Sequence, residues 1–325
     1  TATLFEIKGP IGPPSVSFIE SAIKNATSNQ STILILQLDT PGGLDSSMRK
    51  IIQLLITSPV PVVTFVSPSG ARAASAGTYI LYASHVAAMA PGTNIGAATP
   101  IQLGRGSNQE KTEHYEENSS SSGESDMKRK IINDAEAYLR SLAQLRGRNV
   151  EWTALAVRNG QSISAEEALQ KNVIEIIATH VPDLLAQLDG KEIKLINQTQ
   201  VIRTSGLKIK KIEPDWHTKL LSFITNPNVA YILMLIGIYG IIFEFVSPGI
   251  FVSGIVGAIS FMLSLYAFQV LPISYAGFAL ILLGLALMIA EAFIPSFGIF
   301  GLGGGLAFII GSIFLMDTSV PGYGI

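Results

Sequence analysis

The sequence predicts an α/β domain with a mainly parallel sheet, followed by an all-α domain that crosses a membrane several times. Residues 1–195 alternate strand-like apolar runs with amphipathic helical segments, a β-α-β pattern typical of a parallel sheet with helices packed against it. Between residues 222 and 316 the only charged residues are Glu244 and Glu291. The 325-residue chain is 48% hydrophobic and 14% charged, which is too apolar for a soluble domain of average composition.

The α/β domain is expected to span residues 1–205. An apolar run from Ile33 to Leu38 stops at Pro-Gly-Gly, which predicts a buried strand and a tight turn. Ser164, followed three residues later by Glu167, marks a helix start. Further strands are expected at residues 4–7, 62–66, 85–90 and 172–177, helices at 14–26, 46–57 and 181–187, and a small hairpin at 191–204.

Residues 101–126 are predicted to form a flexible loop, because Gly, Ser, Asn, Glu and Lys dominate that stretch. A solvated insertion and a mobile lid over a neighbouring site both fit this composition. The helix expected next, at residues 127–145, brings Lys130, Asp134 and Tyr138 to one face.

Ser75 is the candidate nucleophile, since it lies among very small residues directly after an apolar run. A hydroxyl that attacks a carbonyl needs close approach of the substrate and a nearby N–H to hold the developing oxyanion. The glycine pair that ends D-T-P-G-G at residues 39–43 would let the backbone approach a ligand closely. Each piece alone also fits a purely structural role, as a small-residue helix start and as an ordinary strand-to-helix turn.

Taken together, these motifs make the chain similar to the ClpP-class membrane-bound serine proteases called NfeD, or stomatin operon partner proteins. The resemblance covers nearly the whole chain and includes the hydrophobic C-terminal third. It rests on D-T-P-G-G at 39–43, A-S-A-G-T-Y at 74–79, S-H at 84–85, A-M-A-P-G-T-x-I-G at 88–96 and S-L-A-Q-x-x-G-R-N at 141–149. It implies a ClpP/crotonase-like fold for the first domain.

The resemblance also implies a Ser-Lys dyad, with Ser75 as nucleophile and Lys130 as general base, and an oxyanion hole made by the backbone N–H groups of Gly43 and Ala76. A lysine acts as a base only in its neutral form, which burial away from carboxylates favours. We therefore expect Lys130 at a buried end of its helix. Asp39 is interpreted as a turn-capping residue rather than as a third catalytic member.

The histidines do not offer a better base. The chain has four, and His85, ten residues after Ser75, would lie at the far end of the same helix, about 15 Å away. ClpP carries a histidine after the following strand, but residues 94–99 contain none. This departure favours a Ser-Lys dyad over a Ser-His-Asp triad.

The membrane domain is expected at residues 229–317, with about four helices at 229–246, 251–270, 275–293 and 297–316, each near the ~20 residues that cross a bilayer. E-F-V-S-P-G-I-F-V-S-G from Glu244 is echoed by E-A-F-I-P-S-F-G-I-F-G from Glu291, which indicates two related helical hairpins. Each carboxylate either faces protein or water as a partner site or caps the next helix near the membrane surface.

The remaining segments bear on topology. Residues 206–228 are predicted to be a juxtamembrane linker, and residues 318–325 the start of a linker to a C-terminal domain outside this sequence.

The first residue is Thr1, which fits a removed signal peptide. Lysines near residue 210 favour a cytoplasmic first domain, whereas a signal peptide favours the other side. We expect an integral protein of the plasma (bacterial inner) membrane with an extracytoplasmic protease domain.

The expected function is a membrane-anchored serine endopeptidase that cleaves hydrophobic segments of membrane-associated proteins, needs no cofactor or metal and forms a homo-oligomer. The resemblance implies a stomatin- or prohibitin-like membrane protein as substrate and partner. The chain has no cysteine, which excludes disulfides, zinc-thiolate sites and a cysteine nucleophile. No basic cluster suggests nucleic-acid binding. The alternatives are a non-catalytic scaffold of a stomatin-like assembly and a crotonase-like enzyme acting on acyl thioesters.

Overall fold

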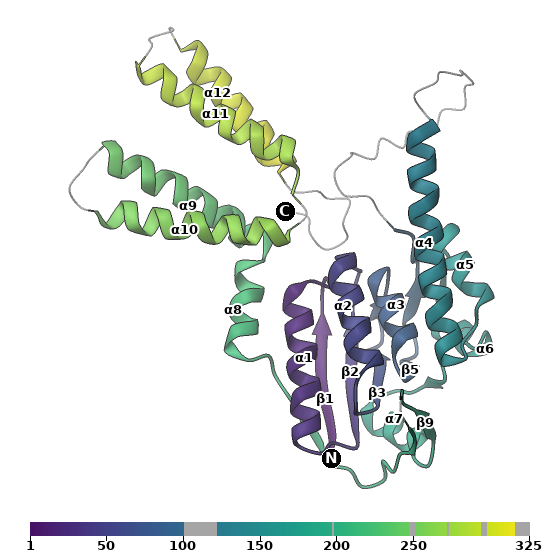
Figure 1. Ribbon diagram of the computed structural model, residues 1–325. Helices are drawn as coiled ribbons and strands as arrows, with labels where there is room; N and C mark the ends of the chain where they lie inside the picture. Colours follow the sequence, from purple (N-terminus) through teal and green to yellow (C-terminus); the bar gives the residue numbers. More distant parts are fainter. Residues whose placement is uncertain (101–121, 197, 247–250, 272, 294–297, 316–325) are drawn as a thin grey trace. The chain divides into compact units, whose positions relative to one another are not determined.

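The computed structural model describes residues 1–100, 122–196, 198–246, 251–271, 273–293 and 298–315 (Figure 1). The chain divides into two compact units, with the boundary between Lys219 and Leu220. The loop predicted at residues 101–126 falls almost entirely outside the described residues, as does the linker predicted at 318–325. Each unit is described by itself.

The first unit is built on a six-stranded sheet in which every neighbouring pair is parallel. Its central strands are continuous apolar runs with nearly every residue buried, as expected for a sheet covered on both faces. In order across the sheet, the strands are β11 (Ile209–Lys211), β1 (Ala2–Lys8), β2 (Ile33–Asp39), β3 (Val62–Val66), β5 (Val86–Met89) and β8 (Ile176–Ile177).

Alternate residues of the strands feed two separate cores. Leu34 and Leu36 of β2 pack in the core shared with α1 (Pro13–Ser28), α2 (Asp45–Ile56) and α3 (Ala76–Ala83), which lie along one side of the sheet in Figure 1. Ile33 and Ile35 face the other core. That second core includes α7 (Val181–Leu188) and the antiparallel hairpin of β9 (Glu192–Lys194) and β10 (Thr199–Val201).

A second, three-stranded sheet follows the first at its carboxyl end. It consists of β4 (Arg72–Ala73), β6 (Asn94–Gly96) and β7 (Ser162–Ser164). Ser164 then caps α6 (Ala165–Gln170), and the capping box with Glu167 that the sequence predicts is present. The remaining helices of this unit are α4 (Ser122–Arg146), α5 (Glu151–Arg158) and α8 (Trp216–Ile224), which ends across the unit boundary.

The α/β fold is confirmed, with most elements within two residues of their predicted ends. Three segments differ. Of residues 172–177 only the last two form a strand, because the chain first turns to bury Val173 and Ile174 in the core. Helix α4 begins at Ser122, five residues before the predicted start. The stretch 206–228, predicted as a linker, contains β11, which pairs with β1, and the helix α8.

The second unit contains α9 (Pro227–Val246), α10 (Val252–Val270), α11 (Tyr275–Phe293) and α12 (Ile299–Phe314), paired as α9 with α10 and α11 with α12 (Figure 1). Glycines allow close approach within each pair: a Cβ on Gly257 would lie 2.8 Å from the Ile241 nitrogen, and one on Gly311 2.7 Å from the Ile281 nitrogen. In the described residues two helices, Pro227–Phe245 and Val252–Gln269, are long and apolar enough to cross a membrane, and Tyr275–Glu291 and Ile299–Phe314 are shorter apolar helices.

Glu244 and Glu291 occupy equivalent places in the two helix pairs. The Glu244 carboxylate accepts hydrogen bonds from the Gly254 nitrogen at 3.2 Å and the Ser253 hydroxyl at 2.6 Å, at the start of α10. The Glu291 carboxylate accepts from the nitrogens of Gly298 at 2.9 Å and Gly301 at 3.2 Å, at the start of α12. Of the two alternatives that the sequence left open, the structure therefore has the capping role, which satisfies free N–H groups at a helix N-terminus.

Candidate functional site

Ser75 lies at the junction between β4 and α3 in a strained backbone conformation. Its φ of 49° and ψ of −116° make it one of the few non-glycine residues at positive φ, a conformation that costs about 1–3 kcal/mol and concentrates at functional sites. The turn is held on both sides: the Ser75 nitrogen donates to the Ala97 carbonyl at 2.7 Å, and its carbonyl accepts from the Thr78 nitrogen at 2.9 Å. Its side chain is half-buried. A sharp strand-to-helix turn of this kind presents a serine hydroxyl at the surface of the sheet.

The D-T-P-G-G turn packs directly against this serine. A Cβ added to Gly42 would lie 2.7 Å from the Ser75 Cβ and 3.1 Å from its Oγ, so only glycine fits there. Backbone hydrogen bonds join the two motifs, since the Thr40 nitrogen donates to the Arg72 carbonyl at 2.8 Å and the Ala74 nitrogen to the Thr40 carbonyl at 3.1 Å. The Asp39 carboxylate accepts from the Arg72 nitrogen at 3.2 Å, a structural contact in keeping with its interpretation as a capping residue.

The backbone N–H groups of Gly43 and Ala76 have no hydrogen-bond acceptor within the described residues. By contrast, the nitrogen of the neighbouring Gly42 donates to the Thr40 hydroxyl at 3.1 Å. Ala76 is the first residue of α3, where the helix has no acceptor to offer and its dipole favours negative charge. These two amides can therefore donate hydrogen bonds to a bound anion.

Gly43→Ala tests the turn. A Cβ at this position would lie 2.1 Å from the Ile11 carbonyl oxygen, so the backbone has to move and its N–H with it. If the Gly43 N–H holds an oxyanion at Ser75, as the sequence predicts, kcat for attack of the Ser75 hydroxyl on a carbonyl substrate should fall by about 10²–10³-fold, the usual effect of removing one oxyanion donor. Steady-state kinetics would measure it, with Gly9→Ala as control, because that glycine also has positive φ but open space around it. Equal losses in both variants would contradict this role for Gly43.

Helix α4 runs beside α3 in the same direction. Near the start of α3, the Tyr79 hydroxyl donates to the Ala135 carbonyl at 3.4 Å and its ring stacks on Tyr138 with centroids 6.1 Å apart. At the other end, the Arg146 Nε donates to the Ala83 carbonyl at 2.9 Å. This direction brings the Lys130 end of α4 to the same end of the helix pair as Ser75.

Lys130 itself is exposed, which corrects the expectation of a buried lysine at a helix start. The physical reason is the length of α4, which begins at Ser122 and so places Lys130 within a protruding helix. Within the described residues Lys130 makes no ion pair. The carboxylates one turn away on either side are bound by arginines instead, Asp126 by Arg129 and Asp134 by Arg49 at 2.7 Å.

Of the three histidines in the described residues, His85 and His180 accept structural hydrogen bonds. His85 follows the end of α3 opposite Ser75, and its Nδ1 accepts from the Val62 nitrogen at 3.2 Å. Burial, with Arg146 and Arg148 nearby, lowers the pKa of His85 to about 3. His180 caps α7 through the Asp183 nitrogen, and His217 lies on α8. His114 falls outside the described residues.

His85 should make the stability of the first unit depend on pH. In the folded state its pKa is about 3, against an ordinary value of about 6.5 in the unfolded chain. Its contribution is therefore complete above pH 6.5 and declines as the pH falls toward 3, because the unfolded state takes up a proton. We expect up to about 2 kcal/mol less stability from this residue at pH 5 than at pH 7.5.

Denaturant unfolding followed by Trp152 fluorescence would measure this dependence. His85→Asn keeps an acceptor for the Val62 N–H but does not titrate, so its stability should vary less between the two pH values. The same pH dependence in the variant and in the unmodified chain would contradict the assignment.

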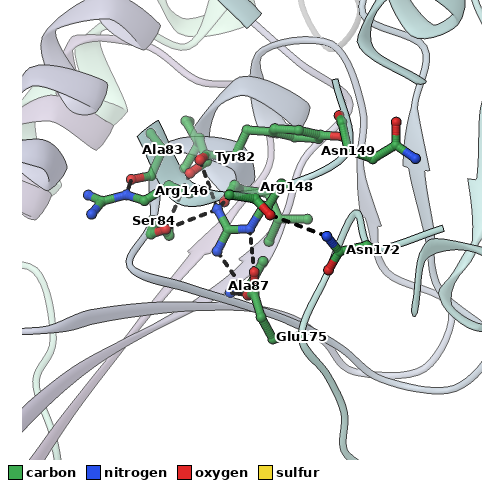
Figure 2. A network of polar contacts seen from close by, with 12 residues as sticks. Tyr82, Ala83, Ser84, Ala87, Arg146, Arg148, Asn149, Asn172 and Glu175 are labelled. Carbon is green, nitrogen blue, oxygen red and sulfur yellow. Dashed lines mark hydrogen bonds and ion pairs between the residues drawn. The ribbon is translucent and has the colours of Figure 1, made fainter. Parts of the chain in front are cut away.

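Arg148 is a residue whose role the sequence did not reveal. Its side chain is 1% exposed, and its Nη1 donates to the carbonyls of Leu81, Tyr82 and Ser84 at 3.1, 2.8 and 3.0 Å (Figure 2). Its Nε and Nη2 bind both carboxylate oxygens of Glu175 at 2.7 and 2.9 Å. Arg148 thus binds the carboxyl end of α3, the helix that directly follows Ser75. The motif G-R-N at residues 147–149 was the one signal for it.

Among the described residues no three His, Asp or Glu side chains come together as a group that could hold a metal ion. The arrangement at Ser75 instead offers a hydroxyl on a strained backbone, two amides without an acceptor among the described residues, and a lysine at the same end of the helix pair. This is a geometry for nucleophilic attack on a carbonyl.

Comparisons with known proteins place both units of the chain in the same family. The model for the N-terminal domain of NfeD1b matches residues 6–198, and that for the NfeD integral membrane domain matches residues 228–325. The chain is 38% identical over 312 residues to the membrane-bound protease PH1510 of Pyrococcus horikoshii, which covers 95% of this chain and 68% of that protein. It is 28% identical over 309 residues to the membrane protein NfeD1b of Bacillus subtilis, covering 93% of this chain and 64% of that protein.

Two of the solved structures that resemble this chain are mutants of one protease. One is a lysine-to-alanine mutant of the 1510-N membrane-bound stomatin-specific protease in complex with a substrate peptide, with a TM-score of 0.60, 34% identity and coverage of 69% of this chain and 96% of that chain. The other is a serine-to-alanine mutant of the same protease, with a TM-score of 0.58, 34% identity and coverage of 66% and 98%.

Proposed function

The chain belongs to the NfeD family, and from this premise we propose that it is a membrane-bound serine endopeptidase whose nucleophile is Ser75. The observation that carries the proposal is the strained Ser75 turn packed against Gly42, where the adjoining residues Ala76 and Gly43 have N–H groups with no acceptor among the described residues. Its membrane character rests on the matched integral membrane domain.

In the proposed mechanism Lys130, in its neutral form, takes the proton from the Ser75 hydroxyl as the oxygen attacks a peptide carbonyl. The N–H groups of Gly43 and Ala76 hold the oxyanion. Lys130 returns the proton to the leaving amine, and a water molecule then releases the acyl group from Ser75. The pairing of Asp126 and Asp134 with arginines supports this role, because a carboxylate next to Lys130 would favour its charged form.

The proposed substrates are hydrophobic segments of a stomatin- or prohibitin-like membrane protein, which would also be the partner. This part rests on the similarity to a stomatin-specific protease. We further propose that the chain lies in the plasma membrane, with the protease domain on the extracytoplasmic side, and acts as a homo-oligomer. Lys130 is exposed in this structure. A hydrophobic peptide bound at Ser75 would cover its side chain and so favour its neutral form.

A serine-directed phosphonate reagent tests the nucleophile. We expect the full chain in lipid nanodiscs to be labelled at Ser75, the label to be lost in Ser75→Ala, and the same variant to lose cleavage of a peptide from the hydrophobic segment of a stomatin-like protein. Ser69→Ala is the matched control and should retain both. Hydrolysis of an acyl thioester without labelling would indicate a crotonase-like enzyme instead, and neither activity would indicate a scaffold.

A further inference from the structure

Helix α8 presents an apolar surface that is exposed in the part of the chain that the structure describes. Trp216 is 66% exposed, Leu220 47% and Phe223 62%. At 100° per residue these three side chains fall within a sector of about 60°. Thr218 is the buried residue of α8, and the stripe of two aromatic rings and one leucine lies on the side of the helix away from it.

The chain connection fixes how far α8 lies from the membrane. Only Thr225 and Asn226 separate it from α9, which begins at Pro227 as one of the helices able to cross a bilayer. Two residues span at most about 7 Å, comparable to the headgroup layer of a bilayer, about 5–8 Å on each side. If α9 crosses the bilayer, the end of α8 therefore lies within about 7 Å of the start of that membrane-spanning helix.

The connection is also closed by hydrogen bonds. The Thr225 nitrogen donates to the Leu221 carbonyl at 2.9 Å, which completes the last turn of α8. The Asn226 side chain accepts from the Asn228 nitrogen at 3.0 Å and caps α9. The two helices thus follow one another at a bonded corner, with no free linker between them.

From these observations we infer that α8 is an interfacial helix that lies on the lipid surface, with Trp216, Leu220 and Phe223 inserted among the headgroups and upper acyl chains. Tryptophan and phenylalanine are the side chains that favour this depth. Lys219, which is exposed beside the apolar stripe, can extend its amine into the headgroup layer. The occupant of this face is lipid, and the inference stands independently of the proposed protease function.

Tryptophan fluorescence provides a direct test, because the chain has two tryptophans. Trp152→Phe leaves Trp216 as the only one. In phosphatidylcholine nanodiscs that contain the full chain, we expect lipids brominated near the headgroup to quench Trp216, and more strongly than lipids brominated near the chain ends. Trp216→Phe is the matched control, since the remaining Trp152 is 2% exposed and should keep its emission. Trp216 emission that responds to aqueous iodide but not to brominated lipid would overturn the inference.

A cysteine pair gives a second measurement, because the chain contains no cysteine. Leu220→Cys lies on the apolar stripe, and Ser222→Cys, also exposed, lies about 200° around the helix. In nanodiscs a membrane-impermeant maleimide should react readily at position 222 and slowly at position 220. Equal reaction at both positions would contradict insertion, and protection of both would indicate a protein partner or a second copy in place of lipid.

Discussion

Lys130→Ala should lower kcat for peptide hydrolysis by about 10²–10⁴-fold, the usual contribution of a general base, while KM changes little. The lysine is proposed to act on the Ser75 proton, so its loss removes a transition-state interaction rather than a binding contact. Initial rates over a range of peptide concentrations, with the full chain in nanodiscs, would separate the two constants. Labelling of Ser75 by the phosphonate reagent should slow in parallel.

Lys128→Ala is the matched control for this variant. Lys128 is exposed on the same helix and carries the same charge, but it lies about 200° around the helix from Lys130. We expect its kcat to stay within a few-fold of the unmodified chain. Equal kcat values for the two variants would remove Lys130 from the mechanism while leaving Ser75 in place.

Arg148→Ala should lower the free energy of unfolding of the first unit by about 3 kcal/mol, toward the lower end of the range for breaking a buried ion pair. The change removes the Arg148 hydrogen bonds to three carbonyls at the end of α3, of which Leu81 keeps the Ser84 nitrogen as a donor, and removes both contacts to Glu175. The lower end applies because the Glu175 side chain is 31% exposed and keeps part of its hydration.

Denaturant unfolding would measure this loss through Trp152, which stacks on Tyr82 with centroids 6.0 Å apart. Both proteins would carry Trp216→Phe, which removes the fluorescence of the second tryptophan. Arg140→Ala is the control, because Glu136 would keep its second arginine partner, Arg158, and the cost should stay near 1 kcal/mol or below. A loss for Arg148→Ala no larger than for Arg140→Ala would show that the network in Figure 2 contributes little.

The fold could be predicted largely from the sequence because its signals are local. The strand Ile33–Asp39 is marked by its own apolar run and by the glycines that end it. The capping box at Ser164 lies within four residues. By contrast, β11 pairs with β1 across some two hundred residues, and its short polar sequence carries no periodic signal. The same limit applies to Arg148, whose partners Leu81 and Glu175 are far from it in the chain.

The candidate site was predictable in composition but not in geometry. Small residues around Ser75 indicated close approach, and the contact with Gly42 has that form. No sequence pattern gives the backbone angles of Ser75, which depend on the Ala97 carbonyl that fixes its nitrogen. The exposure of Lys130 was mispredicted because helix length depends on residues 122–126, whose polar composition favours a loop.

The backbone at Ser75 also constrains how this protein can be made more thermostable. Glycine adopts positive φ without penalty, so Ser75→Gly would release conformational strain at a position where the rest of the helix is fully buried. A search for stabilising substitutions would therefore be drawn to this residue, and under the proposed function the variants it selects would be inactive. Under the proposed function, Ser75 lowers the stability of the fold but is retained because catalysis needs its hydroxyl.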